Sequence, residues 1–344
     1  MTHYCQLTTI FTILDKITIM KTVTIIGYPG ALASTITGAA DLFSMAGVVW
    51  QRIHGEPVEP RFKVQIASAD GGPIACANGL SLMANIKIED VLSSDIIIVP
   101  TIAGRIDDTL KQNATWLPHL KKLHDEGCDV ASNDTGAFVL AEAGILDGKK
   151  ATTHWGFTDL FRALYPQVDL QASQLITADG NVFCSGGGMA WFDLAIYLLE
   201  RYYGHELAKQ TAKAFVFDVG RHDQGAYSSI PGKKYHQDED VLKIQSWLET
   251  NYSQSINLEN LADQFSLSSR SFKRRFKAAT QETPLQYLQK LRIDAAKKQL
   301  ESNRKPIDEI ASIVGYMDQS AFSKLFKRET ALTPGEYRSR FGQR

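Results

Sequence analysis

The sequence contains 344 residues, which at about 100 to 200 residues per domain predicts two folded domains. Its hydrophobic content of 44% and charged content of 22% are ordinary for folded proteins and exclude a long disordered segment. The four cysteines are widely spaced and form no C-x-x-C pair, so we predict neither a metal site nor a disulfide framework and expect free thiols in the cytoplasm.

The N-terminus does not resemble a targeting segment. The first twenty residues lack a basic start, a continuous apolar core and a small-residue cleavage site. Because Met20 precedes a strand-like run and offers a second plausible start, we interpret residues 1–20 as an N-terminal extension that is either disordered or not translated. No stretch approaches the roughly 18 apolar residues that a membrane span needs, so no membrane partner is predicted.

Charge is distributed unevenly along the chain. From Asp240 onward the sequence has 18 Lys and Arg against 12 Asp and Glu, a net charge of +6, which leaves about −7 for the rest. An acidic body joined to a basic C-terminal part indicates that only the C-terminal part contacts a polyanion.

The first two thirds of the chain alternate short Val- and Ile-rich runs with amphipathic stretches. The predicted strands are bounded by Gly, Pro or Asp and comprise residues 22–28, 62–68, 95–100 and 128–132. The amphipathic stretches between them include residues 35–49 and 110–125. Alternation of this kind predicts a parallel sheet that helices cover on both faces.

A further predicted strand, residues 182–185, is followed by the glycines at 186–188 and by an apolar helix over residues 189–203 that Gly204 ends. The glycine run lacks the spacing of a phosphate-binding loop, so a tight turn is sufficient to explain it. The segment 221–240 begins with turn-forming and charged residues without periodicity, and we predict the interdomain linker there.

From Val241 onward the pattern is helical and predicts about seven helices and no strand. Two parts of this region match each other at a shift of about fifty residues. The matching pairs are Leu258–Ala262 with Ile307–Ala311, and Phe276–Tyr287 with Phe326–Tyr337. Each copy combines a short helix that contains a small Ala, a turn of about four residues and a longer helix, which is the pattern of a helix-turn-helix unit.

Apolar and basic residues segregate on the second helix of each copy. Phe272 and Phe276 define an inward face in the first copy, and Phe322, Leu325 and Phe326 define it in the second. The outward side chains are predicted to contact DNA and comprise Ser269, Arg270, Lys273, Arg274, Lys277, Gln319, Ser320, Ser323, Lys324 and Lys327. A single basic helix face is usually only solvated, but a repeated unit in a region of net charge +6 favours DNA binding.

These motifs resemble the DNA-binding domain of the AraC/XylS family. The resemblance covers residues 241–344 and is strongest over Ile307–Arg328 and Thr333–Arg338. It implies double-stranded promoter DNA as the partner. Carried over to this sequence, it implies two recognition helices, over residues 269–279 and 319–329, and a helix over residues 284–302 that connects them. The base contacts that it implies come mainly from Arg270, Lys273, Arg274, Ser320 and Lys324.

The run from Ala131 to Trp155 resembles the class I glutamine amidotransferase-like, or PfpI-like, domain of GlxA-like members of the same family. This resemblance implies an α/β flavodoxin-like three-layer sandwich that acts as a sensor or dimerisation domain, followed by an all-α domain with two helix-turn-helix units. The chain is then organised in four parts: an extension (1–20), the amidotransferase-like domain (21–220), a linker (221–240) and the AraC-type DNA-binding domain (241–344).

In enzymatic relatives of that domain, a cysteine on a strand-to-helix turn acts with a distal histidine. This sequence has Asp134 and Thr135 at that turn, and His154 matches the distal histidine. Because a carboxylate is a poor substitute for a thiolate in acyl transfer, we expect no catalytic residue and no cofactor. Asp134 is interpreted either as a helix N-cap or as a ligand contact, and His154 either as a structural residue or as a ligand contact.

These observations predict a transcriptional regulator that responds to a small molecule through a non-catalytic domain and forms a homodimer. The ligand site is expected at the carboxyl ends of the parallel strands, with Gly104, Asp134, Thr135 and His154. The resemblance implies an amine or amino-acid-like effector, and RNA polymerase is a further candidate partner. Two alternatives stay open: an amidase- or hydrolase-like enzyme fused to a DNA-binding domain, and a dimerisation domain without a ligand.

Overall fold

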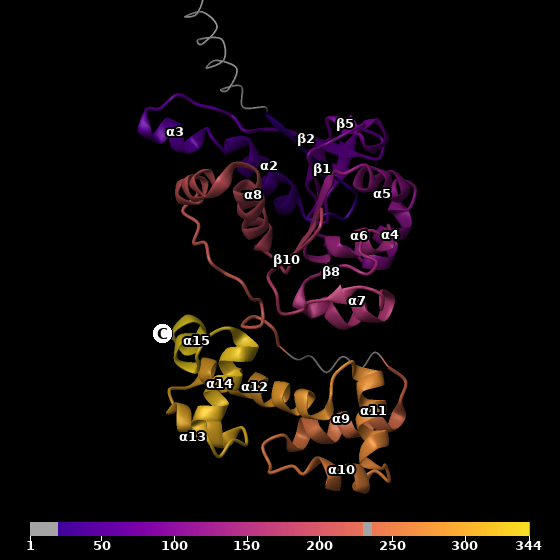
Figure 1. Ribbon diagram of the computed structural model, residues 1–344, viewed down its shortest axis with the longest axis vertical. Helices are drawn as coiled ribbons and strands as arrows, with labels where there is room; N and C mark the ends of the chain where they lie inside the picture. The colour runs from indigo at the N-terminus through magenta and orange to yellow at the C-terminus, as the bar shows by residue number, and fades with distance from the viewer. Residues whose placement is uncertain (1–19, 230–235, 344) are drawn as a thin grey trace, which may run out of the picture. The chain divides into compact units, whose positions relative to one another are not determined.

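The computed structural model describes residues 20–229 and 236–343 (Figure 1). Between His222 and Asp223 the chain divides into two compact units, an α/β unit and a helical unit. The extension predicted over residues 1–20 lies, apart from Met20, outside the described residues. Within the described ranges, no helix is long and apolar enough to cross a membrane.

A seven-stranded sheet forms the centre of the N-terminal unit, with strand order β10-β11-β7-β6-β1-β2-β5. Its neighbouring strands are parallel, except that β10 and β11 are antiparallel. Its strands are β1 (Lys21–Ile26), β2 (Phe62–Ser68), β5 (Ile86–Lys87), β6 (Ile96–Val99), β7 (Asp129–Asn133), β10 (Ile176–Asp179) and β11 (Val182–Ser185). The five strands that the sequence predicted form the middle of the sheet, and the unpredicted β5 and β10 form its edges.

The central strands are apolar because helices cover both faces of the sheet. All four residues of β6 are buried, and so are the last four of β1. The register places Val23 beside Ile96 and Ile25 beside Ile98. Two short strand pairs lie outside this sheet: β3 (Pro73–Ala75) with β4 (Ser81–Met83), and β8 (Lys150–Ala151) with β9 (Asp169–Leu170).

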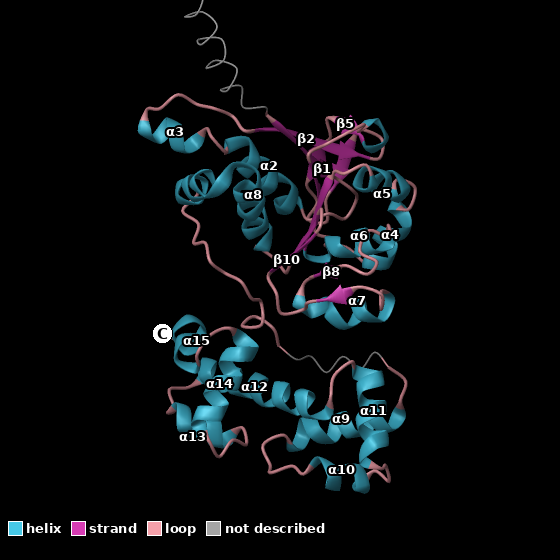
Figure 2. Ribbon diagram, in the orientation of Figure 1, coloured by secondary structure: helices cyan, strands magenta, loops and turns pink. Residues whose placement is uncertain are grey.

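Helices flank the sheet on both sides (Figure 2). Helices α2 and α8 pack together on one face, and α4, α5 and α6 lie on the other. The helices of this unit are α2 (Ala33–Met45), α3 (Val49–His54), α4 (Ile106–Asn113), α5 (Leu117–Asp125), α6 (Ala137–Glu142), α7 (Thr158–Leu164) and α8 (Ala190–Ala214), with short 3-10 helices η1 (Ile88–Asp90), η2 (Asp134–Gly136) and η3 (Trp155–Phe157). The predicted three-layer α/β sandwich is confirmed.

Two helical segments differ from the prediction. The stretch predicted over residues 110–125 is interrupted between α4 and α5, where Trp116 is buried and its indole N–H donates to the Asn113 side chain. The helix predicted to end at Gly204 does break there, because Gly204 has a φ of 82°. A further helical segment follows this break, however, so that α8 extends to Ala214.

The described part of the C-terminal unit contains seven helices and no strand, which confirms the all-α prediction. They are α9 (Glu239–Asn251), α10 (Leu258–Gln264), α11 (Ser269–Thr280), α12 (Pro284–Ser302), α13 (Ile307–Ile313), α14 (Gln319–Thr330) and α15 (Pro334–Phe341). Their buried side chains form two hydrophobic clusters, one around Phe272 and the other around Phe322. Helix α12 joins the clusters, because Leu288 belongs to the first and Leu300 to the second.

Candidate functional site

The C-terminal unit contains two similar helix-turn-helix arrangements, α10 with α11 and α13 with α14. Ser268 caps α11 by accepting a hydrogen bond from the Ser271 amide, and Asp318 caps α14 by accepting one from the Ser320 amide. We call α11 and α14 the recognition helices. Their bounds agree to within one residue with those implied by the family resemblance.

A buried aromatic pair fixes the orientation of each recognition helix. Phe272 and Phe276 of α11 are fully buried, with ring centroids 5.8 Å apart. Phe322 and Phe326 take the equivalent positions in α14, 5.7 Å apart. Side chains four residues apart lie on one face of a helix, so each aromatic pair turns the opposite face of its helix away from the core.

The outward face of α11 is exposed and cationic. Arg270, Lys273, Arg274 and Lys277 are exposed, and none of the four forms an ion pair with another residue in the described ranges. Ser269, at the first turn of the helix, is partly exposed. Unpaired cations on a solvated helix face are free to contact phosphates or base edges.

Arg275 belongs to a different face of the same helix. Its guanidinium forms hydrogen bonds with Asp238, the N-cap of α9, and an ion pair with Asp240 in the first turn of that helix. These contacts raise the pKa of Arg275 and lower the pKa of Asp238. Arg275 therefore attaches α11 to α9, whereas its neighbour Arg274 faces solvent.

The outward face of α14 is less charged and richer in neutral polar groups. Gln319, Ser320, Lys324 and Lys327 are exposed, and Ser323 is half-buried. Gln319 and Ser320 form the first turn of the helix. The amide and hydroxyl groups at this end suit hydrogen bonds to base edges, and the ammonium groups further along suit phosphates.

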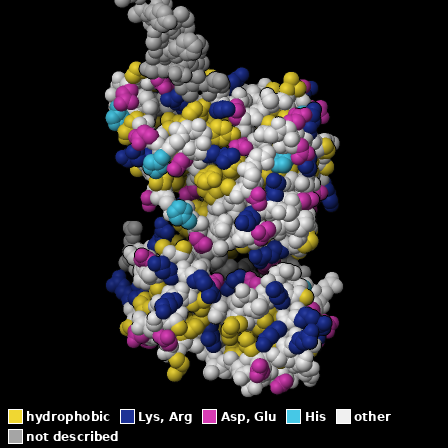
Figure 3. Space-filling model, viewed as in Figure 1, with side chains coloured by type: hydrophobic (Ala, Val, Ile, Leu, Met, Phe, Trp, Pro, Cys, Tyr) yellow, Lys and Arg dark blue, Asp and Glu magenta, His cyan; other side chains and the backbone are white. Residues whose placement is uncertain are grey.

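Helix α12 sets the spacing of the recognition helices. It has 19 residues, which corresponds to about 28 Å at 1.5 Å per residue. Hydrogen bonds from Tyr287 to Glu249 and from Tyr337 to Glu301 attach neighbouring helices near its two ends. Since B-DNA repeats about every 34 Å, a connecting helix of this length suits recognition helices that enter successive major-groove segments on one side of a duplex. Figure 3 shows Lys and Arg side chains gathered over the visible face of the unit.

A second candidate site lies at the carboxyl end of β7. Asp134 follows this strand with a φ of 57°, in the left-handed region that residues other than glycine rarely adopt. Such strained residues concentrate at functional sites, because the surrounding structure has to hold them. Gly136 permits the sharp turn, since a Cβ there would lie 2.5 Å from the carbonyl oxygen of Pro100. We call residues 133–136 the elbow.

The Asp134 side chain ties the elbow to the glycine run after β11. It is 5% exposed, and its two oxygens accept hydrogen bonds from the Thr135 amide at 2.6 Å and the Gly188 amide at 2.7 Å. The Asp134 carbonyl accepts a further bond from the Thr153 hydroxyl at 2.9 Å. The N-cap of η2 is Asn133 and the N-cap of α6, the helix that ends before Gly144, is Gly136, so Asp134 is the N-cap of neither helix.

His154 lies against the same glycine run. Its Nδ1 accepts a hydrogen bond from the Gly156 amide at 2.9 Å and thereby caps the short helix that follows. In the neutral ring this leaves the proton on Nε2. The ring packs on Gly187, where a Cβ would lie 2.1 Å from the His154 Cδ2. Since Gly187 precedes Gly188, the structure brings His154 and Asp134 to one loop.

The other two predicted ligand residues lie on neighbouring parts of the carboxyl edge. Thr135 is buried, and its hydroxyl donates to the carbonyl of Ile102 in the loop after β6. Gly104, further along that loop, is exposed, and its amide donates to the Gly30 carbonyl at 3.2 Å. The structure thus places Asp134, Thr135 and His154 around the elbow, with Gly104 on the adjacent loop.

Tyr28 is a residue of this edge that the sequence analysis did not single out. It follows β1, is buried, and donates a hydrogen bond to the Pro100 carbonyl. Burial, and secondarily the negative charge of Asp134, raise its pKa well above the usual value. Its place directly before Pro29-Gly30, at the end of a predicted strand, is the signal that could have identified it.

None of the described cysteines belongs to the elbow, although Cys184 on β11 pairs with Ser132, the residue directly before it. Cys76, Cys128 and Cys184 are free and buried, and burial raises the pKa of each. A thiol with a raised pKa is a weak nucleophile because little thiolate forms near neutral pH. In residues 20–229 and 236–343, no group of three or more His, Cys, Asp and Glu side chains is arranged to hold a metal ion.

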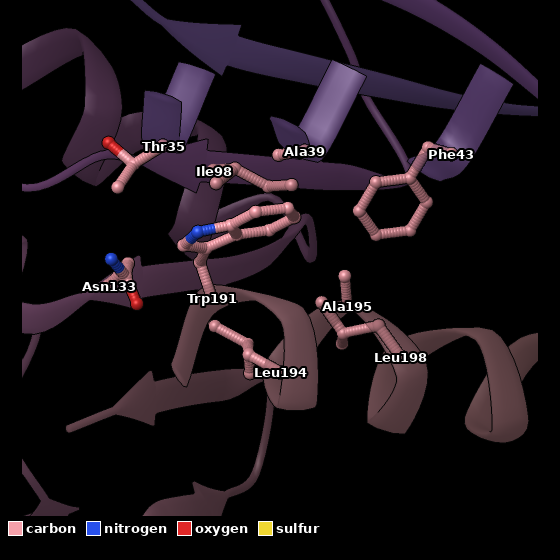
Figure 4. A pocket seen from close by; sticks show the side chains of 9 residues that line it. All are labelled: Thr35, Ala39, Phe43, Ile98, Asn133, Trp191, Leu194, Ala195 and Leu198. Atoms are coloured by element: carbon pink, nitrogen blue, oxygen red, sulfur yellow. The ribbon is translucent and has the colours of Figure 1, made fainter. Parts of the chain in front are cut away.

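A mainly apolar pocket lies between α2, α8 and the sheet (Figure 4). The indole N–H of Trp191 is buried beside it and has no hydrogen-bond partner in the described part of the chain. Gly38 provides room for this ring, because a Cβ there would lie 2.4 Å from it. The indole nitrogen lies on the side of the pocket formed by Thr35 and Asn133. This polar end includes part of the elbow, since Asn133 is the first elbow residue.

The segment that follows the division between the units is attached to the C-terminal helices. Lys297 of α12 is buried, and its ammonium group donates to the carbonyls of Gly225 at 2.6 Å and Ser228 at 2.7 Å. Gly225 also lies against α14, since a Cβ there would be 2.3 Å from the carbonyl oxygen of Glu329. Burial lowers the pKa of Lys297 to about 8. Sequence reasoning missed this attachment because its partners are 72 residues apart.

Comparisons with known proteins agree with these two parts. The family model described as DJ-1/PfpI family matches residues 47–201, and the model described as Helix-turn-helix domain matches residues 261–340. The chain is 28% identical over 279 residues to the HTH-type transcriptional regulator CdhR of Pseudomonas aeruginosa, which covers 81% of this chain and 82% of that one.

Two further similarities concern the N-terminal unit. The isonitrile hydratase of Pseudomonas putida is 29% identical over 205 residues, which covers 58% of this chain and 87% of that one. A crystal structure of a protein from Vibrio parahaemolyticus shares the fold, with a TM-score of 0.50, 22% identity, and coverage of 56% of this chain and 98% of that chain.

Fold, recognition helices and comparisons together define a class of protein, an α/β domain of the DJ-1/PfpI type joined to a double helix-turn-helix domain. More narrowly, the N-terminal unit is a DJ-1/PfpI domain and the C-terminal unit carries an AraC-type helix-turn-helix domain, the combination found in HTH-type transcriptional regulators. Both family resemblances predicted from the sequence are confirmed.

Proposed function

We propose that the protein is a sequence-specific regulator of transcription that binds promoter DNA through α11 and α14. One observation carries the proposal. Two helices with buried aromatic faces and exposed polar faces are joined by a single connecting helix, whose length of about 28 Å is close to one turn of B-DNA. The relatives that share both domains are named as transcriptional regulators, which supports the same function.

The two recognition helices are proposed to make different contributions to DNA binding. The exposed cations of α11 provide most of the electrostatic attraction, with Arg270, Lys273 and Arg274 able to form bidentate bonds to guanine. At the N-terminal end of α14, Gln319 and Ser320 are neutral and select bases by hydrogen bonding. Specificity then comes from both helices, and the salt dependence of binding comes mainly from α11.

The N-terminal domain is proposed to bind a small amine or amino-acid-like effector at the elbow and to form the homodimer. The supporting features are the carboxylate of Asp134, which favours a cation, and the partly exposed ring of His154, whose Nε2 side is free of the capping hydrogen bond. A thermal shift assay against amines and amino acids tests this role, because an effector at 100 times its Kd adds about 2.7 kcal/mol of stability.

The alternative is a catalytic function, which the similarity to an isonitrile hydratase supports. We propose that the elbow does not catalyse, because both Asp134 oxygens accept backbone hydrogen bonds and burial raises the pKa of every described thiol. The elbow would then position the glycine loop around an effector instead of attacking a substrate.

Selection of DNA from a random pool by the full-length protein tests the proposed function. A regulator of this kind is expected to enrich one motif and to bind it about 1,000-fold more tightly than a scrambled sequence, in the presence of heparin at moderate salt. Equal affinity for the enriched and scrambled sequences would refute the proposal.

A pair of charge-matched variants sharpens the test. In the first, the exposed cations of α11 are replaced by alanine at Arg270, Lys273 and Arg274. In the control, three exposed cations outside the recognition helices are replaced at Lys298, Arg304 and Lys305. Sequence preference is expected to be lost in the first variant and retained in the control, although both lose the same net charge.

A further inference from the structure

The turns of the two helix-turn-helix units differ by one residue. Leu267 and Tyr316 make the same backbone bond to the alanine of the preceding helix, and Ser268 and Asp318 are the caps of the recognition helices. In the first unit, Ser268 follows Leu267 directly. In the second unit, Met317 stands between Tyr316 and Asp318, so it is the one residue without a counterpart.

The backbone before this extra residue is fixed by packing. Gly315 has a φ of 92°, and a Cβ there would lie 2.7 Å from the carbonyl oxygen of Ser253. The ring of Tyr316 packs on Phe322, with centroids 5.6 Å apart, and the Arg292 guanidinium lies 5.1 Å from its centre. On the other side, the cap of α14 fixes the chain again. The turn therefore presents Met317 at a defined place.

The Met317 side chain is the most exposed large hydrophobic side chain of the described residues, with a relative exposure of 103%. It directly precedes the cap Asp318 and the polar residues Gln319 and Ser320. In helix-turn-helix proteins, this N-terminal end of the recognition helix is the part that contacts base edges in the major groove. Thymine is the base that offers an apolar group there, its 5-methyl group.

We infer that Met317 contacts the 5-methyl group of a thymine and makes the second unit select thymine at one position of its site. The inference rests on the proposed DNA-binding function and deepens it. Single exposed apolar side chains are common on protein surfaces. Met317 differs from these because it is an added residue, held by fixed neighbours, at the end of a helix that is otherwise polar on its outward face.

The test compares motifs selected from a random pool by the full-length protein and by Met317→Ser. Both are expected to enrich a motif, and one thymine of the wild-type motif is expected to become variable in the Met317→Ser motif. Replacing that thymine by deoxyuridine, which lacks the methyl group, should weaken wild-type binding about three- to fivefold and leave Met317→Ser binding unchanged. Ile313→Ser, at an exposed apolar residue of α13, serves as the control and should keep the wild-type motif.

Other results separate this inference from the function on which it rests. Identical motifs from the two proteins, or equal effects of deoxyuridine on both, would overturn the role of Met317 while leaving DNA binding intact. A loss of transcription by Met317→Ser with unchanged DNA selection would overturn it too and indicate a contact with RNA polymerase. If the wild-type protein itself enriches no motif, the proposed function fails and this inference fails with it.

Discussion

The carboxylate of Asp134 and the amide of Gly188 are joined by a 2.7 Å hydrogen bond that links the elbow after β7 to the loop after β11. The second oxygen accepts from the Thr135 amide. The residue that the family resemblance aligns with a catalytic cysteine therefore joins one loop to another in this structure.

We predict that Asp134→Asn destabilises the N-terminal unit by about 1 to 3 kcal/mol, because one of the two amide hydrogen bonds to the charged carboxylate is lost. Asparagine tolerates the left-handed backbone, so backbone strain does not contribute to the measured change in the free energy of unfolding. Urea unfolding in a Trp247→Phe background reports on this unit, since the other tryptophans of the chain all precede residue 222. The exposed Asp147→Asn is the control, and an equally small effect of both variants would contradict the role of Asp134.

The cysteines give a test of the enzymatic alternative. Burial raises the pKa values of Cys76, Cys128 and Cys184, so we expect slow reaction with iodoacetamide in the native protein at neutral pH and fast reaction after unfolding. Mass spectrometry of the peptides separates these residues from Cys5, which lies outside the described residues. Rapid, selective labelling of Cys128 or Cys184 in the native state would instead indicate a catalytic thiol.

Neighbouring arginines on α11 are predicted to have separable roles. Arg274 faces solvent, so Arg274→Ala should weaken binding to the selected motif by about 1 to 3 kcal/mol with unchanged thermal stability. Arg275 binds Asp238 and Asp240, so Arg275→Ala should lower the Tm and leave the affinity of the folded protein nearly unchanged. An equal loss of Arg274→Ala affinity on motif and random DNA would assign Arg274 to a phosphate.

The recognition faces were predictable because they depend on the local helical period. Phe272 and Phe276 repeat every four residues, and that spacing alone places Arg270 and Arg274 outside. The left-handed backbone of Asp134 was not predictable, because it depends on contacts with Gly188, far along the chain. Contacts between residues far apart in the sequence also explain the other differences between the predicted and the observed structure.

Several features of the fold depend on tertiary packing and could not be predicted from the periodicity of the sequence. The break before α5 follows from the burial of Trp116, and the antiparallel β10 follows from pairing with β11. The hydrogen bond between Lys297 and Gly225 joins α12 to a segment without periodicity. The sequence pattern of α12 did not indicate that this segment binds to it. Polar residues buried by distant partners are the general case in which single-sequence reasoning fails.

Lys297 provides a prediction about pH. Its pKa is lowered to about 8 in the folded protein, against about 10.4 in an unfolded chain. Below pH 8 both states carry the proton and the cost of burying the charge is complete. Between pH 8 and about 10 only the unfolded state keeps the proton, so stability rises with pH. Relative to Lys297→Met, the wild-type protein should gain about 1 kcal/mol per pH unit there.

Urea unfolding of both proteins at pH 7.5 and pH 9.5 measures this gain. The adjacent Lys298 is the matched control, because it is largely exposed and its ion pair with Asp294 raises its pKa. A raised lysine pKa leaves stability unchanged over this range, so Lys298→Met should keep a constant difference from the wild type. A difference that moves in favour of Lys297→Met at the higher pH would contradict the buried, partly desolvated state of Lys297.

Hydroxyl-radical footprinting of the full-length protein on its selected DNA tests the central claim most directly. Because the two recognition helices are connected by α12, which is about 28 Å long, we predict two protected patches on one side of the duplex, about 10 base pairs apart, for each bound copy. The alanine variant at Arg270, Lys273 and Arg274 should lose one patch and retain the other. A single patch, or no protection above that of scrambled DNA, would contradict a domain that binds DNA with both helices.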